Sequence, residues 1–344
     1  MKAYRMTEWQ TAGQLCDVDL REPGPGEVLV KVGGAGVCHS DLHVMDMPAG
    51  ALPYALPFTL GHENAGWIER VGPGVDGWAA GEPVIVYSVW GCGRCATCRV
   101  GAENYCETAP VFCGGGLGFD GGMASHILVP AARFLCPLGD LDPRQAAPLT
   151  DAGLTTYHAV KRSLSLLIPG SSAVVIGAGG LGQMAIQILK AVSPARVIAV
   201  DLSSEKLAAA QSLGADATVA AGDRAAEQVR DLTRGAGAEL VLDIVGSDAT
   251  LQLAVGVGRR LGHLTLVGIA GGSVQFGYFG VPTELSVASV FYGSIPELAE
   301  VTALAQTGKI RPQVELFPLE QAAQVYARLR DGKLRGRAVI TPNG

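Results

Sequence analysis

The stretch VVIGAGGLG, residues Val174–Gly182, decides the fold of this chain. Gly177, Gly179 and Gly182 have the spacing G-x-G-x-x-G, after an apolar run and before a helix candidate, LGQMAIQILKAV. There the first glycine permits a tight turn, the second lets the backbone approach a pyrophosphate, and the third lets helix and strand pack closely. The N-terminus of the helix carries a partial positive charge, which attracts the negatively charged phosphates. The spacing alone is weak among 47 glycines, but its context predicts a dinucleotide-binding unit.

Asp201 ends the next strand candidate, RVIAVD, at a distance from Gly177 that is typical of this fingerprint. A carboxylate at that place can bind the two hydroxyls of the adenosine ribose and would repel the 2′-phosphate of NADP. No arginine follows at once in DLSSEK, so the sequence favours NAD. The alternative is a glycine-rich packing turn beside a solvated Asp201.

The pattern around this stretch indicates more than one domain. From about residue 151 to 285, strand and helix candidates alternate, which predicts an α/β fold with a doubly wound parallel sheet. Residues 1–150 contain short strand candidates such as EVLVKV and EPVIVYSV, broken by glycine and proline, which predict an irregular β domain. Residues 286–344 hold two helix candidates and a final strand, RAVIT, expected to pack back onto the first domain.

Composition sets limits on the function. The chain has 344 residues, 48% of them hydrophobic, with a formal net charge of −6, which argues against a nucleic-acid partner. The start MKAYRMTEWQ lacks the apolar core of a signal peptide, and no long apolar run predicts a membrane helix. We therefore expect a cytoplasmic enzyme that uses neither nucleic acid nor membrane and whose thiols stay reduced.

Four cysteines lie in the segment GCGRCATCRVGAENYC, at Cys92, Cys95, Cys98 and Cys106. Four thiolates at this spacing can close a tetrahedral shell around zinc and leave no open position, which predicts a structural zinc site. The alternatives are a redox switch, for which the surrounding βαβ pattern is missing, and disulfides, which a reducing compartment disfavours.

Three more segments carry candidate ligands: GVCHSDLH with Cys38, LGHENAGWI with His62, and PLTDAGLTTYHA with Asp151. With the glycine motif, the four cysteines and the terminal RGRAVI, in this order, they resemble the zinc-containing medium-chain alcohol dehydrogenases over nearly the whole chain. Within that family, the chain looks like bacterial NAD-dependent secondary-alcohol dehydrogenases and aryl ketone and aldehyde reductases.

The resemblance implies a domain plan. Residues 1–150 would form a GroES-like catalytic domain, with a structural-zinc lobe at about 91–107. Residues 151–285 would form a Rossmann NAD-binding domain. Residues 286–344 would complete the Rossmann edge and return to the catalytic domain.

The resemblance also implies a catalytic zinc held by Cys38, His62 and Asp151, so that each chain would hold two zinc ions. Glu63 would stand beside this zinc as a transient ligand, and Asp41 would orient His62. Many family members have cysteine at the third ligand position. The aspartate here resembles the secondary-alcohol branch, and a harder carboxylate donates less electron density than a thiolate.

For the proton, the resemblance implies a relay from Ser40 to His43, with a surface histidine as the alternative for His43. His39 and Arg337 would contact the pyrophosphate, and Thr155 would lie near the nicotinamide. The full set of predicted cofactor contacts is His39, Thr155, Gly177, Gly179, Gly180, Leu181, Gly182, Asp201, Lys206, Val245, Gly268 and Arg337.

The implied function is the reversible oxidation of secondary and some primary alcohols to ketones or aldehydes, by hydride transfer from a zinc-bound alkoxide to NAD. Three alternatives are a polyol dehydrogenase of the same superfamily, a zinc-free quinone reductase of the same fold, and a non-catalytic zinc or dinucleotide-binding protein. The predicted walls of the substrate pocket are Tyr54, Ser88, Trp90, Leu117, Phe119 and Tyr292.

The segment ELSVASVFYG resembles the region through which family members pair their cofactor domains, although an internal edge strand is the alternative. The resemblance favours a homotetramer and leaves a dimer open.

Overall fold

The apolar runs around the glycine motif form a parallel sheet in the order β13-β12-β11-β14-β15-β16. This is the doubly wound order, in which successive strands are added first on one side of β11 and then, from β14 on, on its other side. The strands are β11 (Ser172–Ile176), β12 (Arg196–Asp201), β13 (Ala217–Ala220), β14 (Ala238–Asp243), β15 (Gly258–Leu266) and β16 (Ser286–Ser289).

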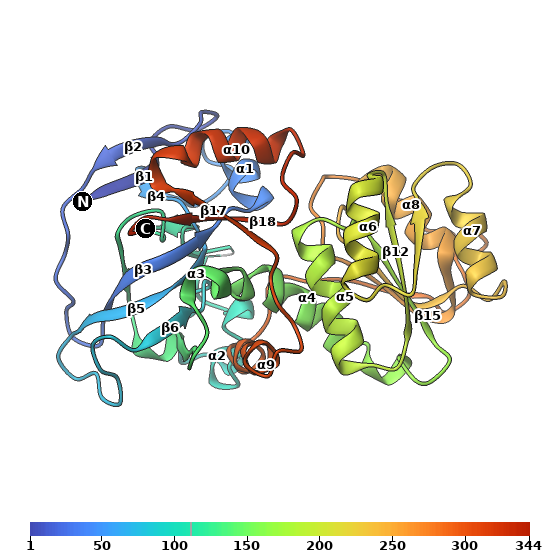
Figure 1. Cartoon of the computed structure of the whole chain (residues 1–344), viewed down its shortest axis with the longest axis horizontal. Helices are drawn as coiled ribbons and strands as arrows, with labels where there is room; N and C mark the ends of the chain where they lie inside the picture. Colours follow the sequence, from blue (N-terminus) through green and yellow to red (C-terminus); the bar gives the residue numbers. More distant parts are fainter. Residues whose placement is uncertain (111) are drawn as a thin grey trace. The chain divides into compact units, whose positions relative to one another are not determined.

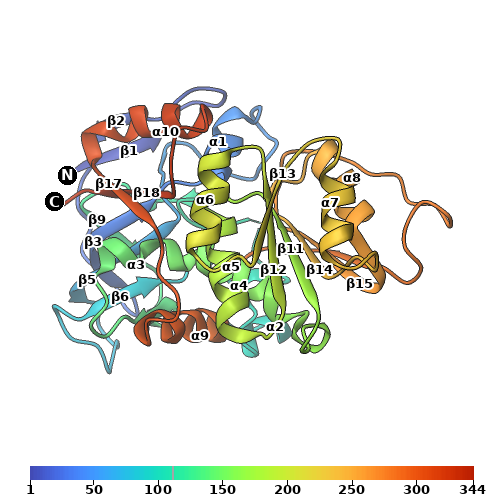
Figure 2. The ribbon, with the colours of Figure 1, turned by 45° about the vertical axis from the view of Figure 1, so that its right-hand side comes forward.

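Helices cover both faces of this sheet: α5 and α6 lie on one side and α7 and α8 on the other (Figures 1 and 2). The helices are α4 (Ala152–Lys161), α5 (Gly180–Val192), α6 (Ser204–Ser212), α7 (Ala225–Leu232) and α8 (Asp248–Val257). The side chain of Ser203 caps α6 by accepting the backbone N–H of Lys206. The core between the layers is formed by side chains of Val, Ile, Leu and Ala, which explains the near-continuous apolar strands.

One strand differs from its expectation. The apolar segment GHLTLVGIA predicts a strand that starts at Gly262, whereas β15 begins four residues earlier, at Gly258. α8 ends at Val257, so the chain enters the sheet without a loop, and the pairing with β14 shifts register between Ala238 and Leu240. The charged residues of this irregular start hide the strand period of two.

A second sheet is built mostly from the first third of the chain. Its order is β10-β6-β5-β3-β18-β17, with β9 also paired to β3, and a smaller sheet has the order β2-β1-β4. The strands are β1 (Lys2–Met6), β2 (Gln14–Asp17), β3 (Val28–Gly36), β4 (Phe58–Thr59), β5 (Glu63–Val71), β6 (Pro83–Val86), β9 (His126–Val129), β10 (Leu135–Pro137), β17 (Val314–Pro318) and β18 (Arg337–Thr341).

The elements beside this sheet carry most of the candidate site. They are α1 (His39–Asp46), α2 (Ala96–Arg99), η1 (Glu103–Tyr105), β7 (Gly114–Gly115), β8 (Gly118–Phe119), α3 (Pro143–Ala146), η3 (Ala147–Thr150), α9 (Ile295–Gln306) and α10 (Ala322–Arg330). α10 runs beside α1 in both views (Figures 1 and 2). The end of the chain thereby reaches the helix that follows Cys38.

The computed structural model describes residues 1–110 and 112–344, which divide into two compact units. The first unit contains Met1–Asp151, Ser294–Gln306 and Pro312–Gly344, and the second contains Ala152–Gly293 and Thr307–Arg311. The predicted fold class, an irregular β part with a doubly wound parallel sheet, is confirmed. Among the described helices, none has the length and apolar character that crossing a membrane requires.

Candidate active site

Cys38, His62 and Asp151 meet in the first unit although they come from three separate segments. Cys38 caps the start of α1, His62 precedes β5, and Asp151 follows η3. Oδ2 of Asp151 lies 3.3 Å from Sγ of Cys38 and 3.6 Å from Nε2 of His62, and one ligand atom from each residue lies within 4.8 Å of the others. All three residues are buried. A thiolate, an imidazole and a carboxylate are a donor set suited to zinc, with a fourth position left for another ligand.

Short polar contacts hold the backbone of this cluster. Gly61 has φ +93°, and a Cβ there would lie 2.8 Å from Cγ of Met123, so glycine fits the turn before His62. Ser88 donates its hydroxyl to the carbonyl of His62. Thr150, next to Asp151, donates to the carbonyl of Val86 over 2.7 Å. Ser88, a predicted wall of the substrate pocket, is thus buried against the backbone of a ligand.

Asp41 lies behind His62. Its Oδ1 is 2.8 Å from Nδ1 of His62, and its Oδ2 accepts the backbone N–H of Cys38 over 3.1 Å. Placing the ring proton on Nδ1 leaves the lone pair of Nε2 for a metal. Oδ2 also accepts the hydroxyl of Tyr326 over 2.8 Å, a contact that no sequence motif predicts.

Glu63 and Arg337 form a buried ion pair next to the three ligands. Nε of Arg337 lies 2.8 Å from Oε2 of Glu63, and Nη2 of Arg337 contacts Oε1 of Glu63 and lies 3.1 Å from Oδ2 of Asp151. Gly36 stands opposite Glu63, where any Cβ would collide with its carboxylate. Sequence reasoning predicted both residues but not this pair, because 274 residues separate them.

Burial and charge act in opposite directions on this pair. Burial raises the pKa of Glu63 to about 7, although Arg337 opposes the shift. Burial lowers the pKa of Arg337, but the negative groups of Cys38, Glu63 and Asp151 together raise it well above its usual range. Arg337 therefore stays charged and balances part of the negative charge of the ligand cluster. Its predicted contact with a pyrophosphate stays a prediction.

The predicted proton relay lies on α1. Oγ of Ser40 is 3.5 Å from Sγ of Cys38. His43 lies one turn further on, partly buried, and its Nδ1 has no hydrogen-bond partner among the residues described. Burial lowers the pKa of His43; Asp46 raises it and Arg330 lowers it further. His43 is therefore neutral near pH 7 and can accept a proton.

In the second unit, predicted dinucleotide residues gather at the carboxyl edge of the parallel sheet. Gly177 follows β11, Asp201 ends β12, Val245 follows β14 and Gly268 follows β15. Gly177 has φ +95°, and a Cβ there would lie 2.8 Å from Cγ2 of Val245. A Cβ on Gly182 would collide with the carbonyl of Gly177, whereas one on Gly179 would meet open space. Close packing at the first and third glycines and space at the second are what the fingerprint requires.

The Asp201 carboxylate also holds the glycine loop. Its Oδ2 accepts the backbone N–H of Ala178 over 2.7 Å, and its Oδ1 accepts that of Ser203 over 2.9 Å. The role of Asp201 in the local structure is thus larger than the sequence suggested. The other predicted cofactor contacts are distributed over both units, with His39 and Arg337 in the first and Thr155, Gly180, Leu181 and Lys206 in the second.

The four-cysteine segment forms a second cluster, in which the four sulfur atoms of Cys92, Cys95, Cys98 and Cys106 lie within 4.8 Å of one another. No disulfide joins them. Backbone N–H groups point at these sulfur atoms: that of Cys95 donates to Cys92 over 3.4 Å, and that of Cys92 donates to Cys106 over 3.3 Å. Hydrogen bonds, first from Thr108, lower the pKa of Cys92 to about 5, whereas burial raises the pKa of Cys98 well above its usual range. The cluster therefore fits the closed thiolate shell of a structural zinc.

Two of the predicted walls of the substrate pocket, Trp90 and Phe119, line a cavity of the first unit that has a volume of about 600 Å³. The rings of Trp90 and Phe119 lie 5.7 Å apart and line it together with Phe134. In the described part of the chain, its lining includes none of the three ligands of the Cys38 cluster. A role of Trp90 and Phe119 in substrate binding stays a prediction.

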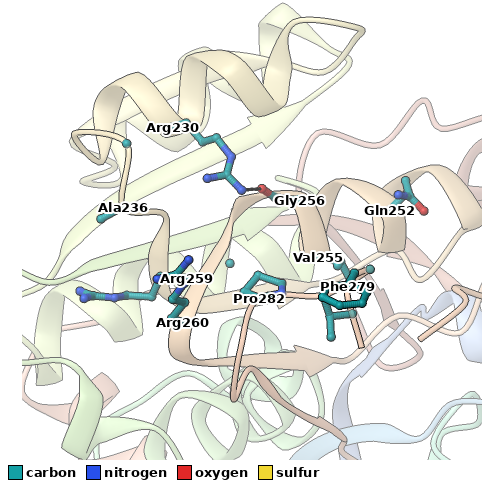
Figure 3. Close-up of a pocket in the computed structure, with 13 residues that line it drawn as sticks. Arg230, Ala236, Gln252, Val255, Gly256, Arg259, Arg260, Phe279 and Pro282 are labelled. Atoms are coloured by element: carbon teal, nitrogen blue, oxygen red, sulfur yellow. Dashed lines mark hydrogen bonds between the residues drawn. The ribbon is translucent and has the colours of Figure 1, made fainter. Parts of the chain in front are cut away.

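A cavity of about 620 Å³ in the second unit is lined by three arginines and Phe279 (Figure 3). Ala236 and Gly258 place it at the amino ends of β14 and β15, so it lies at the opposite edge of the sheet from the glycine motif. Arg230 donates to the carbonyl of Gly256 over 2.6 Å, and Arg259 is paired with Glu239. Two of its three cations thus have structural partners, and this cavity is not the predicted dinucleotide site.

Comparisons with known proteins agree with this geometry. The chain matches the family described as "Alcohol dehydrogenase GroES-like domain" over residues 24–140 and the family described as "Zinc-binding dehydrogenase" over residues 180–307. It is 37% identical to an NAD-dependent alcohol dehydrogenase of Sulfurisphaera tokodaii, covering 99% of this chain and 100% of that one. It is 36% identical to a D-arabinose 1-dehydrogenase (NADP(+)) of Saccharolobus solfataricus, covering 99% of this chain and 97% of that one.

Among solved structures, the alcohol dehydrogenase of Aeropyrum pernix superimposes with a TM-score of 0.92 at 39% identity, covering 99% of this chain and 100% of that one. The resemblance inferred from the motifs is confirmed over both units and the full length of the relatives. With a Cys/His/Asp cluster, a four-cysteine cluster and a glycine fingerprint in the family's order, the chain belongs to the zinc-containing medium-chain alcohol dehydrogenases.

Proposed function

We propose that this protein is a zinc-dependent NAD(H) alcohol dehydrogenase that interconverts secondary alcohols, and some primary alcohols, with ketones or aldehydes. The observation that carries the proposal is the buried cluster of Cys38, His62 and Asp151, whose ligand atoms lie within 4.8 Å of one another. Three protein ligands with a position left open are the arrangement of a catalytic zinc, in contrast to the closed shell of the four cysteines.

When bound, zinc polarises a substrate oxygen and lowers its pKa, and NAD accepts the hydride. The chain's own residues do the rest. Asp41 fixes the ring of His62 and so the direction of its Nε2. Arg337 keeps Glu63 and Asp151 in place and offsets their charge. Burial of the cluster excludes water, which strengthens every electrostatic interaction in it.

We assign the movement of the proton to α1. Ser40 follows Cys38 by two positions, and its hydroxyl lies near Sγ of Cys38, where it can accept a proton from an alcohol. His43 is neutral near pH 7 because burial lowers its pKa, so it can take up the proton and release it to solvent. In the second unit, Asp201 would bind the adenosine ribose of NAD, and the glycine loop would receive the pyrophosphate.

A polyol or sugar dehydrogenase is the second candidate, since one relative is named as a D-arabinose 1-dehydrogenase. NAD preference and substrate class separate the two candidates. Asp201 supports NAD, because a carboxylate repels the 2′-phosphate of NADP.

The deciding experiment measures zinc per chain by elemental analysis, together with NADH consumption on acetophenone, 2-butanone and a panel of sugars and polyols. The proposal expects two zinc ions per chain and faster turnover of the simple ketones, with NADH preferred over NADPH. One zinc per chain without turnover of any carbonyl would support a non-catalytic zinc protein. Faster turnover of sugars would support the second candidate.

We further propose a homo-oligomer, with a tetramer favoured over a dimer. In support, the side chains of Tyr278 and Phe279 are 90% and 97% exposed, and Val287 on the edge strand β16 is 42% exposed. An exposed apolar edge is typical of an association surface. Light scattering of the parent and of Phe279→Ser gives the test: a monomeric parent would reject the proposal.

We propose a cytoplasmic location, which the unpaired state of all eight cysteines supports. We also propose the functional division of the chain: catalysis in the first unit and NAD binding in the second. Cell fractionation tests the location. The division is tested by expressing residues 1–151 together with the other two segments of the first unit, Ser294–Gln306 and Pro312–Gly344, and measuring the zinc that they bind.

A further inference from the structure

A contact between two distant helices lies behind the candidate metal centre. The hydroxyl of Tyr326 on α10 donates to Oδ2 of Asp41 on α1 over 2.8 Å, although 285 residues separate the two. Both side chains are buried. The hydroxyl also lies 3.4 Å from the sulfur of Met123, which is only a weak acceptor, so Asp41 is its main partner.

Asp41 is a shared acceptor with little room for loss. Its Oδ1 faces Nδ1 of His62, and its Oδ2 takes the backbone N–H of Cys38 and the hydroxyl of Tyr326. The residue is 0% exposed, so water cannot replace a missing donor. A buried carboxylate that loses a donor is destabilised and held less firmly. The hydroxyl of Tyr326 therefore completes the environment that fixes the carboxylate behind His62.

Tyr326 keeps its proton at every working pH. Burial, and then the negative charge of Asp41, raise the pKa of Tyr326 well above its usual range. The hydroxyl is thus a permanent donor to Asp41, in contrast to a group that would titrate during the reaction.

We propose that Tyr326 is a positioning residue of the Cys38, His62 and Asp151 centre, acting through Asp41 on the orientation of His62. The inference rests on the proposed function, because it requires zinc at that centre. Hydrogen-bond partners of metal ligands typically contribute 10- to 100-fold to metal affinity. Tyr326 acts one bond further out and shares Oδ2 with a backbone donor, so we expect the lower end, about tenfold.

The fold supplies a matched control at Tyr4. Its ring stacks on that of Tyr326, with centroids 5.8 Å apart and an interplanar angle of 18°. Its hydroxyl is also buried, but it has no hydrogen-bond partner among the described residues. Tyr4→Phe and Tyr326→Phe therefore remove the same atom from the two rings of one stack, and only the second removes a donor to Asp41.

The test uses the full-length holoprotein and the variants Tyr326→Phe, Tyr4→Phe, Asp41→Asn and the double variant Asp41→Asn/Tyr326→Phe. Zinc retained per chain is measured against increasing chelator, with the unfolding temperature and the pH profile of kcat measured in parallel. We expect Tyr326→Phe to lose about tenfold in affinity at one of the two zinc sites and Tyr4→Phe to match the parent. Because Tyr326 acts through Asp41, Tyr326→Phe should add less than about twofold in the Asp41→Asn background.

Three outcomes would overturn the inference. Tyr326→Phe could keep the zinc affinity of the parent, it could lower only the unfolding temperature, or its effect could persist in full beside Asp41→Asn. If any one of these occurs while the parent holds two zinc ions and turns over a ketone, the proposed function stands and only the inference fails. A parent that holds zinc at the four cysteines alone would reject both.

Discussion

Oδ2 of Asp151 lies 3.3 Å from Sγ of Cys38, although 113 residues separate them in the chain. Both groups are negatively charged when they act as metal ligands, and both are buried, so their proximity is unfavourable unless positive charge is present. Arg337 supplies one positive charge at 3.1 Å from Asp151. A divalent cation bound by Cys38, His62 and Asp151 would supply the rest.

Removal of the third ligand tests this centre directly. In Asp151→Ala, we expect zinc to fall from two ions to one per chain and kcat/KM to fall more than about 100-fold, because even outer partners of metal ligands contribute 10- to 100-fold. Asp151→Cys is the control, since a thiolate also binds zinc and should restore the second ion. Elemental analysis and steady-state kinetics give the result. Full activity in Asp151→Ala would disprove the assignment.

The four-cysteine cluster should contribute to stability and leave the chemistry alone. In Cys98→Ser, the closed shell loses one thiolate, and we expect the unfolding temperature to fall by roughly 5 °C or more, since each kcal/mol corresponds to about 2–4 °C in a domain of this size. Cys16→Ser is the control, because Cys16 lies outside both clusters. Calorimetry and zinc content decide the matter: an unchanged unfolding temperature with two zinc ions would contradict a structural site.

The neutral state of His43 sets a pH dependence. Burial lowers the pKa of His43 below 6.5 because it disfavours the charged imidazolium. At a pH above this pKa the imidazole is neutral, so His43 can accept a proton. Alcohol oxidation should therefore decline as the pH falls below about 6.5. We expect that in His43→Gln this decline at low pH disappears and that oxidation slows by about 10-fold or more.

Arg330→Gln sharpens this test. Arg330 lowers the pKa of His43 and Asp46 raises it, so removal of the arginine should move the acid limb to higher pH. The pair of Arg330 and Asp46 is about half exposed, so the shift should shrink at high salt. A profile that is identical in the parent, His43→Gln and Arg330→Gln would exclude His43 from the relay.

Arg337 and Glu63 should contribute far more to stability than a surface pair. Glu63 is 0% exposed, so Arg337→Gln leaves a buried carboxylate without its cation, and we expect a loss of about 3 kcal/mol in the free energy of unfolding. Arg330→Gln, which breaks an exposed pair, should cost less than about 1 kcal/mol. Denaturant unfolding measures both, and Glu63→Gln/Arg337→Gln should recover part of the loss. Equal small losses in the two single variants would contradict a buried pair.

Asp201 should determine the choice between NAD and NADP. In Asp201→Gly, the repulsion of the 2′-phosphate disappears, and we expect the ratio of kcat/KM for NAD over NADP to fall by about tenfold or more. Because the carboxylate also accepts the N–H groups of Ala178 and Ser203, Asp201→Asn is the matched variant that keeps an acceptor in the loop. An unchanged ratio in both variants would limit Asp201 to its role in the loop.

The sequence by itself determined the parts whose signals are local. Gly177 and Gly182 are needed within one turn between a strand and a helix, so their spacing, together with the apolar run before it and the helix candidate after it, predicted the βαβ unit. The four cysteines lie within one short segment, and their spacing predicted the closed cluster that the structure contains. The motifs around Cys38, His62 and Asp151 predicted the three-ligand centre through the family they resemble.

Tertiary structure alone decided how those residues are supported. Tyr326 reaches Asp41 across 285 residues, and Arg337 reaches Glu63 across 274. No spacing rule connects such pairs, because they depend on which strands and helices the sheet brings side by side. Burial then determines how much each contact contributes. On the surface, water can replace the hydrogen bond of a tyrosine or an arginine, whereas water does not reach a buried carboxylate and cannot replace it there.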